Sequence, residues 1–304
     1  MNTTQTKQRR RLFRRLEDNL PPLVLTERDL SILRFVQEYR FLNTAQIQAL
    51  VGGSYHNVTE RLSRLFHLAY LDRPAHQREL RHEGYRVMIY AIAPKGVRAI
   101  AMQAGAPASV PRHLGEDNRT AKRFHLAHTL MVSQFRVCLT LACERRPDLT
   151  LTRWRIPEQP LARVTVGNRR VAVIPDAYFV ITGAEGESAH FFLEADRGTM
   201  TQARFLTKLQ AYWQLRSRDV SPVSPVIPRA FRVLTIAESR QRMKNLLSTA
   251  ENADPQHRGS RMFCFAAEGE YGLRHPETLL APIWRTPAES TPRSLLEGRG
   301  GSRD

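Results

Sequence analysis

The feature that most constrains the fold is a change in hydrophobic periodicity along the chain. Between residues 25 and 68, apolar residues recur at helical spacing in three short segments. From residue 149 onward, short apolar runs alternate with helical segments. Residues suited to capping precede the three early helices, namely Thr26, Asn43 and Ser54. The chain therefore predicts a small helical region followed by a separate region of strands and helices.

Two segments that follow the third helix are expected to be strands, residues 70–73 and 85–92, on either side of a polar loop, residues 74–84. Three short helices followed by a two-stranded hairpin is the element order of a winged helix-turn-helix. The alternative is a small helical core with an incidental hairpin. A further helix is expected from Pro94-Lys95-Gly96.

The third helix and the loop between the strands carry the candidate DNA-binding residues. In a winged helix, polar, aromatic and basic side chains of this helix contact base edges and phosphates, and arginines of the wing contact the backbone. The helix candidates are Tyr55, His56, Asn57, Thr59, Arg61 and Arg64. The wing candidates are Arg78, Arg81 and Arg86.

The charge balance indicates a polyanionic partner. The chain has 46 Lys and Arg residues against 29 Asp and Glu residues, which leaves a net charge of +17. This favours double-stranded DNA, because phosphate contacts dominate such binding. Binding to a membrane surface is the competing interpretation, but no Lys-rich amphipathic helix with aromatic anchors supports it. The first 22 residues are either a disordered tail or a basic DNA-binding arm that contains Lys7, Arg9, Arg10, Arg11, Arg14 and Arg15.

Several classes of protein are disfavoured. No run of eighteen apolar residues and no signal-peptide core is present, so we expect a cytoplasmic protein that does not enter the membrane. The three cysteines are too few for a disulfide framework, and Cys138 and Cys143 are expected to be buried thiols. Nucleotide-binding loops, a nucleophile elbow and a zinc-protease motif are all absent from the sequence.

The middle of the chain is expected to connect two domains. Residues 103–116 have the composition of a linker, and a long helix is predicted over residues 117–145. His125 and His128 lie three residues apart on this helix, which allows either a metal pair or packing roles. The helix either connects the domains or supports a homodimer, which would suit a palindromic DNA site.

The C-terminal region is expected to be an α/β domain with a mixed sheet and crossover helices. Strands are predicted over residues 149–156, 170–181, 189–196, 231–238 and 262–268, and helices over residues 201–216 and 239–252. The fold class is therefore α+β overall. The predicted domains are a basic arm (1–22), a winged helix (23–104), a linker and connecting helix (105–148), an α/β domain (149–285) and a disordered tail (286–304).

Three acidic residues of this domain are candidates for a metal-binding or catalytic site. Asp176 lies in or beside one predicted strand, and Glu194 and Asp196 end the next. Carboxylates at the ends of adjacent strands can converge on a divalent metal. The layout resembles the PD-(D/E)xK nuclease fold, in which Asp176 and Glu194 match the acidic positions. The position of the lysine is occupied by Asp196.

This departure leaves three alternatives open. In a metal-dependent nuclease, Lys208 on the following helix would replace the missing lysine, with Mg²⁺ or Mn²⁺ held by Asp176, Glu194 and, as a third ligand, Asp196. In a degenerate nuclease-like domain, the acids pair with Arg197 and the domain binds DNA or a partner protein. The remaining alternative is an ordinary polar cluster. No cofactor is expected unless the domain is catalytic.

The combination of these motifs resembles the replication-relaxation family of bacterial plasmid and mobile-element proteins. The resemblance spans residues 25–240, and its sharpest motif is the segment 194–199 with Lys208 and Tyr212 downstream. It implies a DNA-binding protein that acts in replication, relaxation, mobilisation or transcriptional control. Replication or transfer proteins are the partners that such a role implies.

Overall fold

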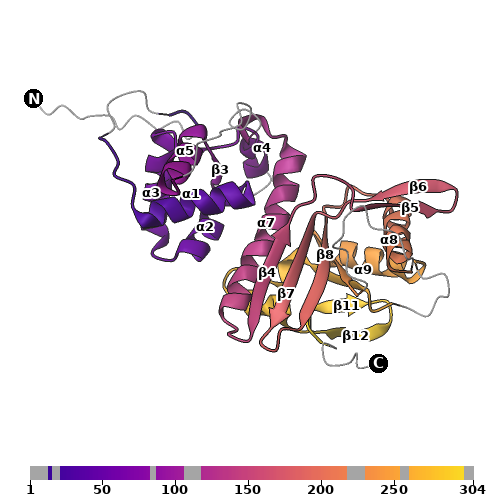
Figure 1. Ribbon diagram of the computed structural model, residues 1–304. Coiled ribbons are helices and arrows are strands. Elements are labelled where there is room, and N and C mark those ends of the chain that lie inside the picture. Colours follow the sequence, from indigo (N-terminus) through magenta and orange to yellow (C-terminus); the bar gives the residue numbers. More distant parts are fainter. Residues whose placement is uncertain are drawn as a thin grey trace, which may run out of the picture. The chain divides into compact units, whose positions relative to one another are not determined.

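The computed structural model describes residues 13–15, 21–82, 87–105, 118–217, 230–253 and 260–297. The chain divides into two compact units, Met1–Ser133 and Gln134–Asp304, hereafter unit 1 and unit 2. Figure 1 shows a mainly helical unit 1 and a unit 2 built around one large sheet. The molecule therefore has the mixed α+β character that the sequence predicts.

Unit 1 contains short helices and a small sheet. Its helices are α1 Glu27–Tyr39, α2 Thr44–Val51, α3 Tyr55–His67, α4 Gln77–His82 and α5 Pro94–Gln103. Its strands are β1 Leu42–Asn43, β2 Leu71–Asp72 and β3 Ile89–Ile92, which form an antiparallel sheet in the order β1-β3-β2.

Capping residues set the helix boundaries of unit 1, as predicted. Thr26 and Asp29 form a reciprocal capping box at the start of α1, and Asn43 and Gln46 form another at the start of α2. Ser54 caps α3 by accepting a hydrogen bond from the Asn57 N–H at 3.2 Å. Local hydrogen bonding therefore defines where these helices begin.

The predicted polar loop over residues 74–84 is wrong, because helix α4 occupies most of it. The Gln77 side chain is buried and bonds both the N–H and the carbonyl of Ile89, at 2.9 and 3.1 Å. Leu80 is buried in the same cluster as Ile89. A polar sequence thus forms a helix because one amide and one leucine dock against β3. The strands are also shorter than predicted, and residues 83–86 lie outside the described part.

Helix α7, Arg123–Glu144, begins later than the predicted residue 117. Leu126 and Leu130 join the core cluster of unit 1, and Phe135 contacts the Trp154 and Phe179 rings of unit 2. By length and composition α7 is the one described helix that could cross a membrane, but 67% of its most apolar window is buried. That burial is typical of a core helix.

Unit 2 is a seven-stranded mixed sheet with an additional hairpin. The sheet has the order β12-β11-β10-β9-β8-β7-β4, and β5-β6 form a separate ribbon. The strands are β4 Leu149–Arg155, β5 Ala162–Val166, β6 Arg169–Val173, β7 Ala177–Gly183, β8 Ser188–Asp196, β9 Arg232–Ala237, β10 Phe263–Ala267, β11 Trp284–Thr286 and β12 Glu289–Arg293. The helices are α8 Gln202–Ser217, α9 Arg240–Glu251 and two 3-10 turns, Glu268–Glu270 and Pro276–Leu280.

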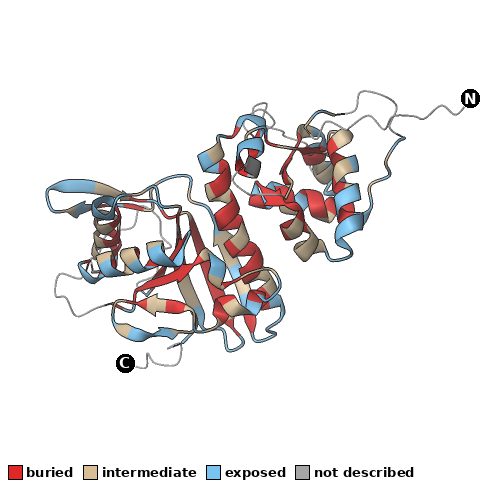
Figure 2. Ribbon diagram, turned by 180° about the vertical axis from the view of Figure 1, so that it is seen from behind, coloured by how far each residue is buried: buried red, intermediate tan, exposed pale blue. Residues whose placement is uncertain are grey.

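Strands β8, β9 and β10 run parallel, and α8 and α9 connect them in turn. Such crossovers are the connections that parallel strands require. One face of the sheet packs on α8 and α9 through a cluster that includes Phe192, Phe265 and Leu209. Helix α7 lies on the other face (Figures 1 and 2), where the Phe135 ring contacts those of Phe179 and Trp284. The predicted mixed sheet with crossover helices is confirmed.

Two predictions for unit 2 need correction. The predicted strand 170–181 is interrupted: β6 ends at Val173 and β7 begins at Ala177, with Pro175, which has no N–H to donate to a ladder, between them. The predicted disordered tail contains β12, and Arg232 donates to the carbonyls of Leu295 and Glu297, both at 2.6 Å. The tail is therefore part of unit 2 as far as residue 297.

Candidate functional site

Two carboxylates of neighbouring strands come together in unit 2. Asp176 lies immediately before β7, and its N–H donates to the Leu193 carbonyl of β8 at 2.9 Å. Its Oδ2 accepts a hydrogen bond from the Ala195 N–H at 2.7 Å. Since Glu194 lies between those two residues, the hydrogen bonds fix Asp176 beside Glu194.

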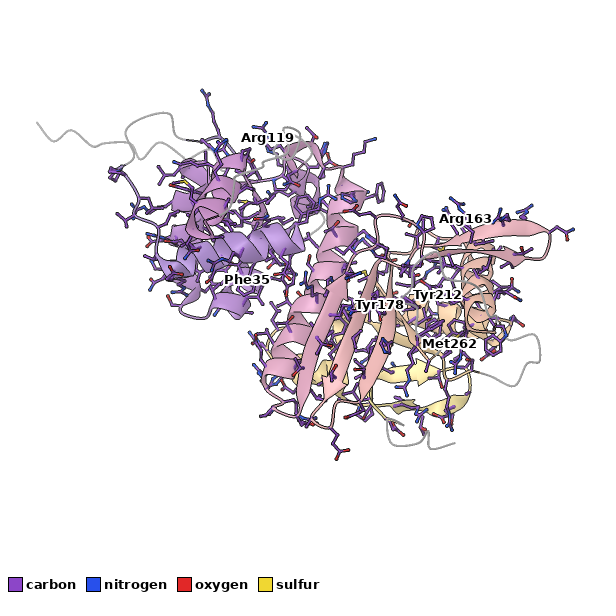
Figure 3. The ribbon with its side chains drawn as sticks, in the orientation of Figure 1. Phe35, Arg119, Arg163, Tyr178, Tyr212 and Met262 are labelled. Carbon is purple, nitrogen blue, oxygen red and sulfur yellow. The ribbon has the colours of Figure 1, made fainter. Side chains whose placement is uncertain are left out.

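Helix α8 supplies both partners of the Glu194 carboxylate. Lys208 Nζ donates to Oε2, and the Tyr212 hydroxyl donates to Oε1 at 2.5 Å. Residues four apart lie on one face of a helix, so α8 places both donors over the same carboxylate. Tyr212, labelled in Figure 3, is fully buried, and Glu194 is only 4% exposed. The predicted association of Asp176, Glu194 and Lys208 is thus present, with Tyr212 as a fourth member.

Burial controls the ionisation of this cluster. Removal from water and the nearby Asp176 carboxylate raise the pKa of Glu194 to about 7, against the opposing charge of Lys208. Burial lowers the pKa of Lys208, but Glu194 and Asp176 more than offset this, so its pKa lies above the ordinary value. Burial also raises the pKa of Tyr212 well above its usual range, so Tyr212 stays a hydrogen-bond donor at neutral pH.

Asp196 belongs to a different ion pair. Its Oδ1 and Oδ2 accept from Nε and Nη2 of Arg242 on α9, at 2.7 and 3.0 Å. Oδ1 also accepts from the Gly198 N–H at 2.8 Å. Arg242 donates in addition to the Met200 carbonyl, at 2.5 Å. Asp196 is therefore part of a bidentate structural pair, and Arg242 has the role that the sequence suggested for Arg197.

The donor set does not fit a preformed divalent-metal site. Both oxygens of Glu194 and both oxygens of Asp196 already accept hydrogen bonds from cations or hydroxyl groups. In the described part of the chain, no group of three or more His, Cys, Asp or Glu side chains could hold a metal ion. The buried Thr235 hydroxyl, on β9 opposite Glu194, has no hydrogen-bond partner, but one oxygen does not complete a magnesium shell.

Most of the predicted DNA-binding residues on α3 have exposed side chains, but Arg61 is paired within unit 1. Exposed side chains are those of Tyr55, His56, Asn57, Thr59 and Arg64. Tyr55 is 51% exposed. Val58, Leu62 and Leu65 are buried on the opposite side of α3, as the sequence predicts.

Arg61 is engaged inside unit 1. Its Nε donates to Asp29 Oδ1 at 2.5 Å, and Nη2 bonds both Asp29 Oδ2 and, at 3.1 Å, the Val24 carbonyl. Asp29 is almost fully buried in the α1 capping box, and its pKa is lowered: burial opposes this, but hydrogen bonds from Arg61 and Thr26 prevail. We therefore leave Arg61 out of the proposed DNA surface, because its guanidinium neutralises a buried acid.

The structure describes only some of the predicted wing and arm residues. The Arg78 guanidinium lies 4.5 Å from the centre of the Phe13 ring. The side chain of Arg81, and Arg86 altogether, lie outside the described residues, as do Lys7, Arg9, Arg10 and Arg11. Arg15 of the predicted arm donates to Asp72 and to the carbonyls of Phe66 and Leu71, at 3.0 and 3.1 Å. Arg15 is thus anchored to unit 1.

The histidine and cysteine predictions can also be placed. His125 packs edge-on against Phe41, with ring centres 6.4 Å apart, which favours the packing role over a metal pair. Cys138, Cys143 and Cys264 are buried free thiols, as predicted for the first two.

Sequence reasoning missed Arg242, the partner of Asp196. The two residues are 46 positions apart, and no spacing rule connects them. The helix that carries Arg242 was predicted, but a basic residue on a solvated helix gives no signal of its partner. Only the packing of α9 beside β8 reveals the pair.

The fold and the site define a two-unit α+β protein whose C-terminal unit contains a buried acid–lysine–tyrosine cluster. A family model described as replication-relaxation matches residues 33–229, which is more than half of the chain. The chain therefore belongs to the replication-relaxation family. The match includes α3, Asp176, Glu194 and Lys208, and it ends before Arg242. No curated protein and no solved structure matches the chain significantly.

Proposed function

We propose that this protein binds double-stranded DNA through unit 1 and acts in replication or DNA relaxation on a bacterial plasmid or other mobile element. The family assignment points to a role in replication or relaxation, with DNA and replication proteins as partners. The observation that carries DNA binding is the arrangement of α2 and α3. A turn of three residues, Gly52 to Ser54, joins these helices, and α3 exposes polar and basic side chains.

The antiparallel sheet of unit 1 supports a winged helix-turn-helix. In such a domain the second helix of the motif enters the major groove and the strands flank it. Here α3 would be the recognition helix, and Asn57 has the amide that can pair with adenine. The segment between β2 and β3 contains α4, so the proposed wing is partly helical.

Arg64→Ala is expected to reduce the slope of log K against log salt by about one unit, because one phosphate contact is lost. Binding to all duplex sequences should weaken to a similar extent. Fluorescence anisotropy over a salt series measures both quantities. Arg98→Ala removes the same charge from an exposed position on α5 and should leave the slope unchanged. If Arg64→Ala behaves like Arg98→Ala, Arg64 does not contact phosphate.

For unit 2 we propose a nuclease-like domain that does not cleave DNA. Asp176 immediately before β7, Glu194 in β8 and Lys208 in α8 follow in the order that the nuclease resemblance implies, which favours the relationship. The Glu194 carboxylate is occupied by Lys208 and Tyr212, and Asp196 by Arg242, which disfavours metal-dependent catalysis. The unit would then recruit DNA or a replication or transfer protein.

Purified protein is therefore expected to retard supercoiled DNA without nicking it, whether Mg²⁺, Mn²⁺ or EDTA is present. Agarose gels of supercoiled and linear DNA measure binding and cleavage together. The matched control is Asp176→Asn, which keeps an oxygen to accept the Ala195 N–H while removing the charge. Metal-dependent nicking by the native protein that disappears in Asp176→Asn would establish a nuclease and refute this proposal.

A further inference from the structure

The β5–β6 hairpin of unit 2 has two different faces. Cross-strand pairing places Ala162 opposite Val173 and Val164 opposite Val171. Ala162, Val164 and Val173 are buried in the cluster that includes α8, with Val171 packed against it. Because side chains alternate along a strand, the residues between them point to the opposite, outer face. The hairpin is therefore held to unit 2 by one face only.

The outer face is polar and basic. Its two cross-strand pairs are Arg163 with Ala172 and Thr165 with Arg170. Arg163 and Arg170 are diagonal neighbours on this face, and both are exposed. Arg169, which pairs with Val166, lies on the other side of the hairpin and is exposed beside the Gly167-Asn168 turn, where Gly167 has the positive φ of 56° that a two-residue hairpin loop needs. Figures 2 and 3 show this exposed ribbon and the labelled Arg163 on it.

The arginines on this face are not paired with any residue that the structure describes. Arg163 and Arg170 have no ion pair or hydrogen bond from their side chains to any other residue that the structure describes. No Asp or Glu occurs between residues 159 and 175. Elsewhere in unit 2, buried acids are matched by Arg242, Lys208 and Arg285. Two adjacent unmatched arginines therefore form a local positive surface on a projecting ribbon.

We propose that Arg163, Thr165 and Arg170 form a second DNA-binding surface that contacts the phosphate backbone of duplex DNA without reading its sequence. A two-stranded ribbon has dimensions that fit the major groove. Guanidinium groups bind phosphate in a bidentate manner, and a threonine hydroxyl can donate to phosphate oxygens. The choice of DNA as the polyanion rests on the proposed function, but the surface itself is independent of α3.

The double variant Arg163→Ala/Arg170→Ala is expected to reduce the slope of log K against log salt by about two units. The loss should be equal for duplexes of unrelated sequence, and at 0.1 M salt affinity should fall about tenfold or more. The full-length protein and labelled duplex DNA are used in an anisotropy salt series. Arg163→Lys/Arg170→Lys keeps the charge and should retain most of the slope.

A control variant and a duplex RNA probe test the inference further. Lys244→Ala/Arg274→Ala removes two exposed charges elsewhere on unit 2 and should leave the slope unchanged. An unchanged slope in the hairpin variant, or an equal fall in this control, would overturn the inference. Preferential binding of duplex RNA through the same arginines would overturn the assignment to DNA.

Failure of this inference is distinguishable from failure of the proposed α3 interface. If Arg64→Ala lowers the slope and the hairpin variant does not, the hairpin surface is wrong and the α3 interface stands. If only the hairpin variant lowers the slope, the α3 interface is wrong. If neither variant does, both are wrong.

Discussion

Lys208→Met is expected to lower the free energy of unfolding by about 1.4 kcal/mol more at pH 8 than at pH 5. The substitution keeps most of the side-chain volume but leaves the Glu194 carboxylate, which is almost fully buried, without its cation. Removal of one partner of a buried pair is costly, because the remaining charge has lost its water and gained nothing in return. Urea denaturation followed by circular dichroism measures the loss.

The pH dependence of that loss identifies its cause. The folded-state pKa of Glu194 is about 7, which is above its ordinary value of 4.5. The contribution of this carboxyl group to stability is therefore full below pH 4.5 and declines as the pH rises through 7. Without Lys208 the folded-state pKa rises further, so the decline continues to higher pH. The difference between variant and native protein should therefore be small at pH 5 and grow above pH 7.

A matched double variant controls for packing. In Glu194→Gln/Lys208→Met no charge is buried, so much of the lost stability should return and the pH dependence should flatten. Lys244→Met, at an exposed position on α9, should change stability by less than about 0.5 kcal/mol. A loss in Lys208→Met that is the same at pH 5 and pH 8 would mean that the buried charge is not responsible.

Arg242→Ala is expected to destabilise unit 2 by about 3 kcal/mol. Asp196 would keep the Gly198 hydrogen bond but lose both bonds from the guanidinium, and its side chain is only 4% exposed. The Met200 carbonyl would lose a donor as well. Thermal and urea unfolding report the change.

Arg240→Ala provides the control on the same helix. Arg240 is 76% exposed, at 3.6 Å from Glu270, and Arg285 also pairs with that acid at 2.8 Å. Its loss should therefore cost less than about 0.5 kcal/mol. Equal effects of Arg240→Ala and Arg242→Ala would show that the Asp196 pair contributes no special stability.

The helices of unit 1 were predictable because their boundaries are coded locally. The Thr26 and Asn43 capping boxes and the Ser54 cap each involve residues only three positions apart. Helix α4 was not predictable in this way, because its formation depends on Gln77 docking against Ile89 of β3, 12 residues away. Likewise, β12 lies in a segment of Ser, Thr, Pro and Arg that has no apolar alternation, and it forms by pairing with β11.

In the candidate site, too, some features were predictable from the sequence and others depended on the fold. Asp176 and Glu194 were predictable as neighbours, because they mark adjacent strands, and Lys208 because it lies on the next helix. The sequence left open whether Asp196 binds a metal, and the structure pairs it with Arg242. Arg61 looked like a DNA contact from helical register alone, until the fold placed it against the buried Asp29.

The sequence by itself determined the caps and faces of the helices, the mixed α/β pattern and the acids of unit 2, since each depends on residues close together in the chain. Only the tertiary structure decided which cations these acids pair with and which arginines remain free on the surface. The physical reason is that neutralising a buried carboxylate depends on distance in space. A basic residue carries the same charge in the sequence whether it faces Glu194, Asp196 or water.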